Sequence, residues 1–394
     1  MADYLLTILL YAVVYIVSIL FFYAADHAQS KNRMIRCMLV GIALLSVFAG
    51  IRNPTVGSDT IGTTTLYFDI AQRYDSIGSI FSQFSSLNGT FIYLLISKIV
   101  IALGLGTRTF LGILQALTVT PIAICAYHRK KYTPIPITMA LYIILYYQLS
   151  FNWVRQSVSV AILLLAVVLY FEDKKVVATI LLIASTLFHS SALFGIPMII
   201  VARLASNVKK RYLKNIVLVI TVILTFIIMQ NWQRLSIMGV EMGILPYTYR
   251  GYINVFSGAH GTSFRGWFAI GTKTYVEYFL RVLMFMVPLL IQNNLVAADT
   301  DTEFAFFRTT SLLSLLIYSA AFFGLHTAYG NRVTYLLDLF NIIYFGYASF
   351  RSSQAKGLSV PASGLLLILI SLFYNIWLYY VLGWHDTVPY LFSF

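Results

Sequence analysis

Apolar runs of about twenty residues alternate with short polar stretches along nearly the whole chain. A helix needs about 20 residues to cross a hydrocarbon core of ~30 Å, and a helix satisfies its backbone hydrogen bonds within one segment. Strands of a β-barrel would instead alternate polar and apolar positions, which these runs do not. The pattern predicts an all-α, polytopic transmembrane bundle of about twelve helices. The predicted spans are 4–23, 34–51, 107–127, 135–150, 155–171, 176–188, 191–204, 215–231, 276–292, 304–325, 332–350 and 358–382.

The composition supports a membrane protein, since 59% of the residues are hydrophobic and only 10% are charged. A soluble domain carries about 25% charged residues. The two cysteines, Cys37 and Cys125, lie in or beside apolar runs. We interpret them as packing residues, without a disulfide or metal framework. The run from Tyr4 to Tyr23 lacks a basic start and a cleavage site, which favours a retained helix over a signal peptide.

The basic residues indicate how the spans are oriented. With twelve spans, the clusters in 31–36, 129–131, 174–175, 203–214 and 351–356 all fall on one side, which the positive-inside rule assigns to the cytoplasm. This rule accounts for the net charge of +13 without nucleic acid. Residues 1–394 then form one membrane domain, with long external loops at 52–106 and 231–275. Segment 91–103 is short and contains Lys98, so we interpret it as a re-entrant or interfacial helix.

Several polar residues fall on the opposite, external side, where the positive-inside rule does not explain them. Arginine is the side chain best shaped to bind phosphate through two parallel hydrogen bonds. Arginines facing a lipid bilayer from outside therefore indicate an anionic, lipid-linked substrate. The candidate substrate-binding residues on this side are Arg52, Arg155, Gln156, Arg250, Arg265, Arg332 and Tyr335.

Arg52 ends one predicted span and precedes a turn that contains Pro54 and Gly57. This turn is expected to bring Arg52 close to Asp59. An Arg–Asp pair that pins the loop and a direct contact with substrate are both compatible with this arrangement.

Arg155 and Gln156 open a predicted helix, whose N-terminus favours anions. We interpret Arg155 as a phosphate contact; the alternative is an arginine that extends to the membrane interface. Arg332 repeats this position at another helix start. Asp338 lies one turn deeper, and we expect it to pair with Arg332 or with a neighbour such as Arg308.

His189, at the apex of the short predicted hairpin 176–204, is a candidate general base. A hydrogen-bonded structural histidine is the alternative. Asp59 and Glu241 are carboxylates that could deprotonate a sugar hydroxyl, and the sequence does not choose between them. Arg250 lies among tyrosines, which suit either sugar stacking or the membrane interface.

The sequence contains no nucleotide-binding glycine loop of the GxGxxG or GxxxxGK[ST] type and no HExxH motif. The predicted cytoplasmic loops are too short to hold a soluble catalytic module. We therefore expect any chemistry to occur in the membrane or at its outer face. We predict no cofactor and no metal, because the arginines can neutralise the charge of the substrate.

Four motifs, in order along the chain, resemble the EpsG-like group of bacterial polysaccharide polymerases. The first motif is Arg52 with Val56, Gly57, Asp59, Thr60 and Tyr67, and the second is Phe151-Asn152 with Arg155-Gln156. The third motif is Ala184-Ser185 with Phe188-His189-Ser190-Ser191-Ala192-Leu193, and the last is Val388-Pro389-Tyr390-Leu391-Phe392. Tyr390 joins the candidate substrate-binding residues through this resemblance.

The resemblance implies a Wzy-type glycosyltransferase in the bacterial inner membrane. Such an enzyme joins oligosaccharide repeat units carried on polyprenyl (undecaprenyl) diphosphate, during synthesis of exopolysaccharide, capsule or O-antigen. Its expected partners are these lipid-linked oligosaccharides, membrane lipids and a chain-length regulator. The alternatives are an O-antigen ligase-like glycosyltransferase, a membrane acyltransferase, or a flippase for the same lipid-linked sugars.

Overall fold

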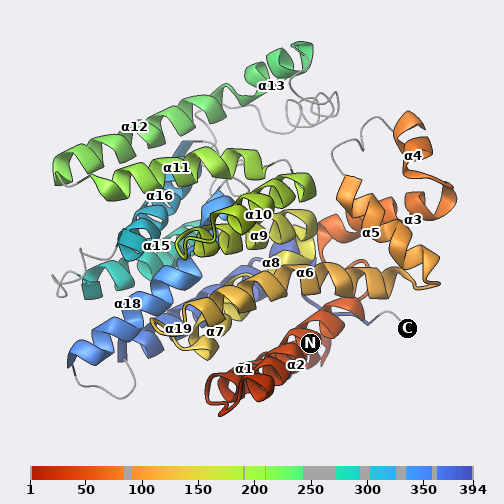
Figure 1. The fold of residues 1–394 in the computed structure, drawn as a ribbon, viewed down its shortest axis with the longest axis horizontal. Coiled ribbons are helices and arrows are strands. Elements are labelled where there is room, and N and C mark those ends of the chain that lie inside the picture. Colours follow the sequence, from red (N-terminus) through yellow and green to blue (C-terminus); the bar gives the residue numbers. More distant parts are fainter. Residues whose placement is uncertain are drawn as a thin grey trace.

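The computed structural model describes residues 2–83, 91–189, 191–208, 210–242, 272–292, 302–324, 334–356 and 362–392, and these form an all-α bundle (Figure 1). The longer helices are α1 (Ala2–Asp26), α2 (Lys31–Gly50), α5 (Phe91–Ala102), α6 (Thr107–His128), α7 (Ile135–Leu145), α9 (Val154–Tyr170), α10 (Lys175–Phe188), α11 (Ala192–Asn207), α12 (Arg211–Gln230), α13 (Trp232–Glu241), α15 (Thr272–Gln292), α16 (Thr302–Gly324), α18 (Asn341–Lys356) and α19 (Ala362–Asn375). The shorter helical elements are η1 (Thr60–Thr65), α3 (Leu66–Arg73), α4 (Ile77–Gln83), α8 (Leu149–Asn152), η5 (Ile376–Val381) and η6 (Trp384–Asp386).

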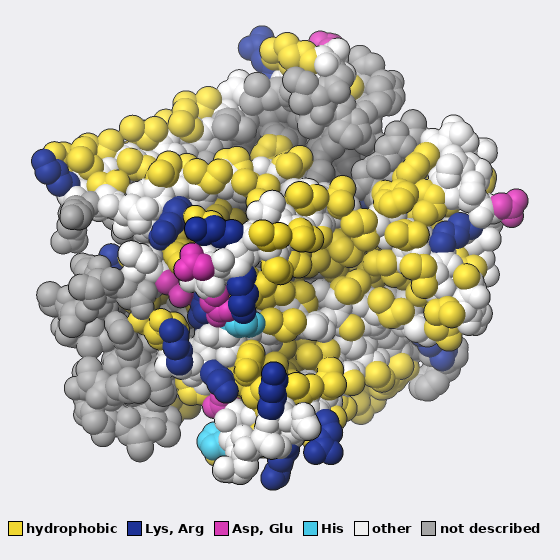
Figure 2. All heavy atoms as spheres, viewed as in Figure 1, with side chains coloured by type: hydrophobic (Ala, Val, Ile, Leu, Met, Phe, Trp, Pro, Cys, Tyr) yellow, Lys and Arg dark blue, Asp and Glu magenta, His cyan; other side chains and the backbone are white. Residues whose placement is uncertain are grey.

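The predicted polytopic membrane fold is confirmed, since every predicted span coincides with helical residues in the described part of the chain. Within that part, four segments are long and apolar enough to cross a membrane: Tyr4–Asp26, Lys31–Gly50, Thr107–His128 and Gly364–Val381. Shorter apolar helices pack beside them. Figure 2 shows the consequence: hydrophobic side chains cover broad stretches of the described surface, and the charged side chains gather in a few patches.

The helices run back and forth between two ends of the bundle. The basic end contains the turns at 129–134 and 171–174, and the site end is where α2 stops at Gly50 and α9 begins. Helices α2 and α6 approach closely near the site end, because Gly50 lies against Gly112. A Cβ atom on Gly50 would lie 2.8 Å from the carbonyl oxygen of Arg108. Small residues at such crossings allow close helix packing in membranes.

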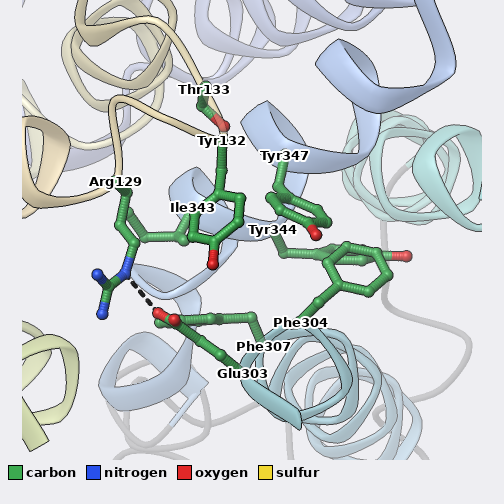
Figure 3. Close-up of a pocket in the computed structure, with 9 residues that line it drawn as sticks. All are labelled: Arg129, Tyr132, Thr133, Glu303, Phe304, Phe307, Ile343, Tyr344 and Tyr347. Atoms are coloured by element: carbon green, nitrogen blue, oxygen red, sulfur yellow. Dashed lines mark ion pairs between the residues drawn. The ribbon is translucent and has the colours of Figure 1, made fainter. Parts of the chain in front are cut away.

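Ion pairs at the basic end connect three helices. Arg129 lies 3.0 Å from Glu172 in the α9–α10 turn and also pairs with Glu303 on α16. Figure 3 shows this second pair beside the aromatic ring of Tyr132. His128 lies 2.8 Å from Glu172. These contacts fix the relative positions of α6, α9 and α16 at the end opposite the candidate site.

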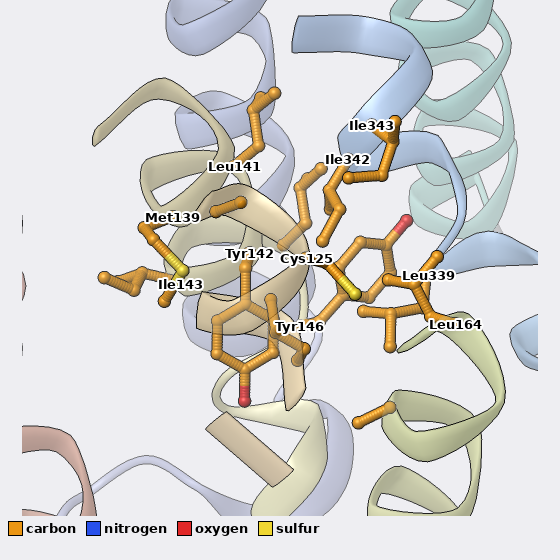
Figure 4. Close-up of a cluster of buried hydrophobic side chains, with 14 of the residues drawn as sticks. Cys125, Met139, Leu141, Tyr142, Ile143, Tyr146, Leu164, Leu339, Ile342 and Ile343 are labelled. Carbon is orange, nitrogen blue, oxygen red and sulfur yellow. The ribbon is translucent and has the colours of Figure 1, made fainter. Parts of the chain in front are cut away.

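The core is built from α6, α7, α9 and α18, whose side chains interdigitate around Cys125 (Figure 4). Cys125 is fully buried there and Cys37 is partly buried, and neither forms a disulfide. The interpretation of both as packing residues is confirmed. Tyr142 and Tyr146 use their rings as apolar filling while their hydroxyls bond to polar groups, as buried tyrosines usually do.

Three predicted segments differ in detail. The span 135–150 is interrupted, because α7 ends at 145 and the short helix α8 carries the chain to 152. The predicted loop 52–106 is largely helical, through η1, α3, α4 and α5. Helix α5 has twelve residues, about 18 Å at 1.5 Å per residue, which is too short to cross the bilayer. The predicted loop 231–275 begins with helix α13, and residues 243–271 lie outside the described residues.

Candidate functional site

Asn152 joins the loop after α2 to the start of α9. Its side-chain Oδ1 accepts a hydrogen bond from the backbone N–H of Asp59 at 2.6 Å and from the Ser58 hydroxyl at 3.0 Å. Beside it, the hydroxyl of Thr60 donates to the carbonyl oxygen of Phe151 at 2.6 Å. The loop and the helix start therefore form one hydrogen-bonded unit at the site end.

Gly57 makes the turn of this loop possible. Its φ is +97°, in the left-handed region that favours glycine. A Cβ atom at this position would lie 2.6 Å from the carbonyl oxygen of Phe151. The predicted turn is confirmed, and it presses the loop against the α8–α9 junction.

Arg52 is held by backbone carbonyls. Its side chain is only 1% exposed, donates to the carbonyl oxygens of Ala49 and, at 3.5 Å, of Phe151, and lies 4.5 Å above the centre of the Phe151 ring. Burial lowers the pKa of this guanidinium from its ordinary value. The expected pairing of Arg52 with Asp59 is therefore wrong: the loop is pinned by carbonyls and by Asn152. A contact of Arg52 with substrate stays a prediction.

The C-terminal segment folds back over this loop. The N–H of Gly57 donates to the carbonyl of Asp386 at 2.9 Å, and the N–H of Asn53 donates to that of Leu391 at 2.7 Å. These bonds join segments that lie more than 300 positions apart in the sequence. The C-terminal motif of the chain is thus part of the candidate site.

Tyr390 anchors that segment. Its ring stacks on Phe48 with centroids 4.2 Å apart, and its hydroxyl donates to the carbonyl of the same residue. Its N–H donates to the Thr7 hydroxyl at 2.9 Å. Burial raises the pKa of Tyr390 above its ordinary value, so the phenol stays neutral. These contacts are structural, and binding of substrate by Tyr390 stays a prediction.

Arg155 has an aromatic setting at the first turn of α9. The centre of its guanidinium lies 5.0 Å from the ring centroid of Tyr67 on α3 and 5.8 Å from that of Tyr93 on α5. The Tyr93 hydroxyl donates to the carbonyl of Thr64 at 3.0 Å, which fixes that ring. None of the N–H groups of Arg155 is hydrogen-bonded within the part of the chain that the structure describes. The two rings therefore hold the cation in place at the start of α9.

His189 lies at the α10–α11 turn, at the same end as Arg155. The hydroxyl of Ser159 on α9 donates to the carbonyl of Ser185 on α10 at 2.7 Å, so the two helices are antiparallel neighbours. The His189 Nδ1 accepts from the N–H of Ser191 at 3.1 Å and lies 2.7 Å from its hydroxyl oxygen. The ring therefore stabilises the turn, while its role as a base, like that of Asp59, stays a prediction.

A pocket lies beside the α8–α9 junction, between this junction, α15, residues 334–338 and the C-terminal segment. Asp338 forms an ion pair with Arg281 on α15 and not with Arg308, whereas Arg332, the other expected partner, lies outside the described residues. Glu277, one turn earlier on α15, accepts from the Tyr318 hydroxyl at 3.1 Å. The residues lining the pocket are Leu145, Tyr146, Leu149, Trp153, Glu277, Arg281, Met284, Phe285, Tyr335, Asp338, Tyr374, Leu378, Tyr379, Trp384 and His385.

Tyr335 and Gln156 are both brought to the site end. The Tyr335 hydroxyl lies 3.0 Å from that of Ser157 on α9, and its ring meets Trp153 edge to face with centroids 5.3 Å apart. Tyr335 and Gln156 are 1% and 3% exposed, respectively. Tyr335 thus forms a wall of the pocket, and contact of either residue with substrate stays a prediction.

The remaining candidates, Arg250, Arg265 and Arg332, lie outside the described residues. The sequence assigned no role to four residues that the structure places at the site: Asn152, His385, Glu277 and Arg281. The last two carried a signal, since charged residues inside an apolar run mark functional sites in membranes. Within the described ranges, no group of three His, Cys, Asp or Glu side chains could hold a metal ion.

Fold and site together define a polytopic helical membrane protein with arginine, carboxylate and aromatic side chains gathered at one end. The EpsG family model matches residues 34–392, nearly the whole chain, and the chain belongs to the EpsG family. No curated protein and no solved structure matches it. Membership of this family indicates a polysaccharide polymerase-like role.

Proposed function

We propose that this protein is a polysaccharide polymerase that joins oligosaccharide repeat units carried on polyprenyl diphosphate, at the outer face of the bacterial inner membrane. Family membership supports the broad activity. The observation that carries the finer proposal is the setting of Arg155, whose guanidinium lies over two tyrosine rings and whose N–H donors have no partner among the described residues. When aromatic rings pack on the flat face of a guanidinium, the N–H donors along its edge can bind a diphosphate.

The proposed reaction transfers the growing glycan from its carrier to the next repeat unit. A hydroxyl oxygen of the acceptor sugar attacks the anomeric carbon of the donor, and a new glycosidic C–O bond forms. The C–O bond to the diphosphate breaks, and polyprenyl diphosphate leaves with the bonding electrons. Arg155, with Arg250 and Arg332, stabilises the charge that develops on the leaving group. His189 or Asp59 takes the proton of the hydroxyl.

The orientation of the bundle agrees with this reaction. Arg129, Lys130 and Lys174 lie at the basic end, which the positive-inside rule assigns to the cytoplasm. Arg155 lies at the opposite end, where the diphosphate of an exported lipid-linked glycan would be found. Two lipid-linked substrates would reach it sideways through the bilayer.

The proposal is tested with purified protein in liposomes that contain lipid-linked repeat units from the host. We expect longer glycans on the same carrier, a loss of roughly 100-fold or more for Arg155→Ala, and a partial loss for Arg155→Lys, which keeps the charge without the planar fork. Arg33→Ala, at the exposed start of α2, is the control. Relocation of units without elongation would identify a flippase, and transfer only to a lipid A core would identify a ligase.

A further inference from the structure

Arg203 lies one turn before the end of α11, at the basic end of the bundle. The centre of its guanidinium lies 4.9 Å from the ring centroid of Phe171, in the turn that joins α9 to α10. The side chain is partly exposed, but its Nη1 is closed off from solvent, so the group is held against the protein. Its guanidinium has no hydrogen bond or ion pair with another residue that the structure describes. Arg203 is therefore a held cation whose charge the described residues leave open to an anion.

Two carboxylates at this end are occupied by other cations. Glu172 lies 3.0 Å from Arg129 and 2.9 Å from Lys174. Glu303 pairs with Arg129 as well. A guanidinium taken partly out of water costs free energy unless an opposite charge compensates it. Since no described carboxylate supplies that charge to Arg203, an anion from outside the chain would complement it.

The neighbours of Arg203 indicate that this anion belongs to a lipid. Ile200 and Leu204, on the same helix, are 53% and 60% exposed, as the lipid-facing residues of a membrane helix are. Tyr170, the last residue of α9, and Tyr212, in the first turn of α12, are exposed at the same end. Tyrosine is enriched where a membrane meets water. These features place Arg203 at the depth of the lipid headgroups, with a surface for acyl chains beside it.

We propose that Arg203 binds the phosphate of an anionic glycerophospholipid in the leaflet at the basic end, with the acyl chains of that lipid along Ile200 and Leu204. With Nη1 closed off, the edge formed by Nε and Nη2 suits two phosphate oxygens in parallel. A headgroup with net negative charge complements the cation, whereas a zwitterionic headgroup carries a cation of its own. This site lies at the end of the bundle opposite Arg155 and does not depend on the proposed polymerase function.

Native mass spectrometry of the purified full-length protein tests the site, with phosphatidylglycerol or phosphatidylcholine titrated in detergent. We expect Arg203→Gln to weaken phosphatidylglycerol binding by roughly 10- to 100-fold, the effect of losing a charged pair of hydrogen bonds. Arg203→Lys keeps the charge without the planar fork and should lose less. Arg33→Gln, at the exposed start of α2, removes the same charge from the same end and should cost about fivefold at most. Equal losses in Arg33→Gln and Arg203→Gln would indicate only the general attraction of a basic surface and overturn the proposal.

Thermal unfolding in detergent separates lipid binding from a loss of fold. We expect phosphatidylglycerol to raise the melting temperature of the wild type more than phosphatidylcholine does, because a ligand that binds only the folded state stabilises it. Arg203→Gln should melt like the wild type without lipid and lose the extra rise. An equal rise with both lipids, or with inorganic phosphate in place of lipid, would contradict the lipid site. A wild type that elongates no glycan would refute the proposed function and leave this result unchanged.

Discussion

The guanidinium of Arg155 lies 5.0 Å from the centre of the Tyr67 ring, so the first turn of α9 and helix α3 share one cation–π contact. This contact holds Arg155 in place, and its role as a phosphate contact stays a prediction. Its position is fixed by neighbouring aromatic rings, which reduces the entropy that would be lost on binding a phosphate.

Removing the Tyr67 ring should weaken the function while preserving the fold. Tyr67→Leu loses the cation–π contact, worth about 0.5–2 kcal/mol, so we expect polymer synthesis to fall by about twofold to thirtyfold. Tyr67→Phe keeps the aromatic face and should stay within about twofold of wild type. The measurement is polymer length and amount in cells that carry only the variant. Equal effects of Leu and Phe would show that the hydroxyl, rather than the ring, is needed.

A side chain at Gly57 should disrupt the loop on which the site is built. Gly57→Ala places a Cβ 2.6 Å from the carbonyl of Phe151 and forces alanine to adopt φ +97°, so we expect a destabilisation of about 1–3 kcal/mol. Gly62→Ala is the matched control, since a Cβ there meets no atom within 4 Å. Thermal unfolding in detergent compares the two. A Gly57→Ala melting temperature equal to that of the control would contradict the loop geometry.

Neutralising one member of the Arg281–Asp338 pair should cost more than neutralising both. Asp338→Asn leaves a buried guanidinium without its counter-charge, and losses of about 3–5 kcal/mol are typical of such changes. The double variant Arg281→Gln with Asp338→Asn removes both charges and should be more stable than either single variant. Unfolding of the four proteins gives the coupling energy of the pair. Additive effects would mean that the two groups do not interact.

Acidification should weaken the basic end through Glu172. Burial raises the pKa of Glu172, but hydrogen bonds from Lys174 and His128 outweigh it, so the pKa lies below its ordinary value of 4.5. A carboxyl with a lowered pKa stabilises the fold above its unfolded pKa, and this contribution is lost as the pH falls through the folded value. The gap in melting temperature between wild type and Glu172→Gln should therefore close below pH ~4.5. A gap that persists in acid would refute the argument.

The helices could be read from the sequence because the bilayer allows few alternatives. Runs such as those of α1, α2 and α6 are long, apolar and bounded by charge, and their ends were predicted to within a few residues. The break at 145 was missed because Tyr146, Tyr147 and Leu149 continue the apolar run beyond it. The helices η1, α3 and α4 were missed because their short, polar sequences resemble a loop.

The side-chain partners could not be read from the sequence for a different reason. Asn152 and His385 meet although 233 positions separate them, and Arg281 and Asp338 meet across two helices. Spacing within one segment predicts neighbours on one helix face, but it gives no information on which faces meet. Asp338 pairs with Arg281 and not with Arg308, because tertiary packing decides which helices bring their charges together.

The membrane side on which the site end opens is the central claim, and cysteine labelling measures it directly. Cys37 and Cys125 are first replaced by serine, and single cysteines are then introduced at Thr55, exposed at the site end, and at Lys174, exposed at the basic end. A membrane-impermeant maleimide added to intact cells, with the outer membrane permeabilised where the host has one, should label position 55, whereas position 174 should react only after lysis. Labelling of position 174 but not 55 in intact cells would place the arginine site in the cytoplasm and contradict the proposed function.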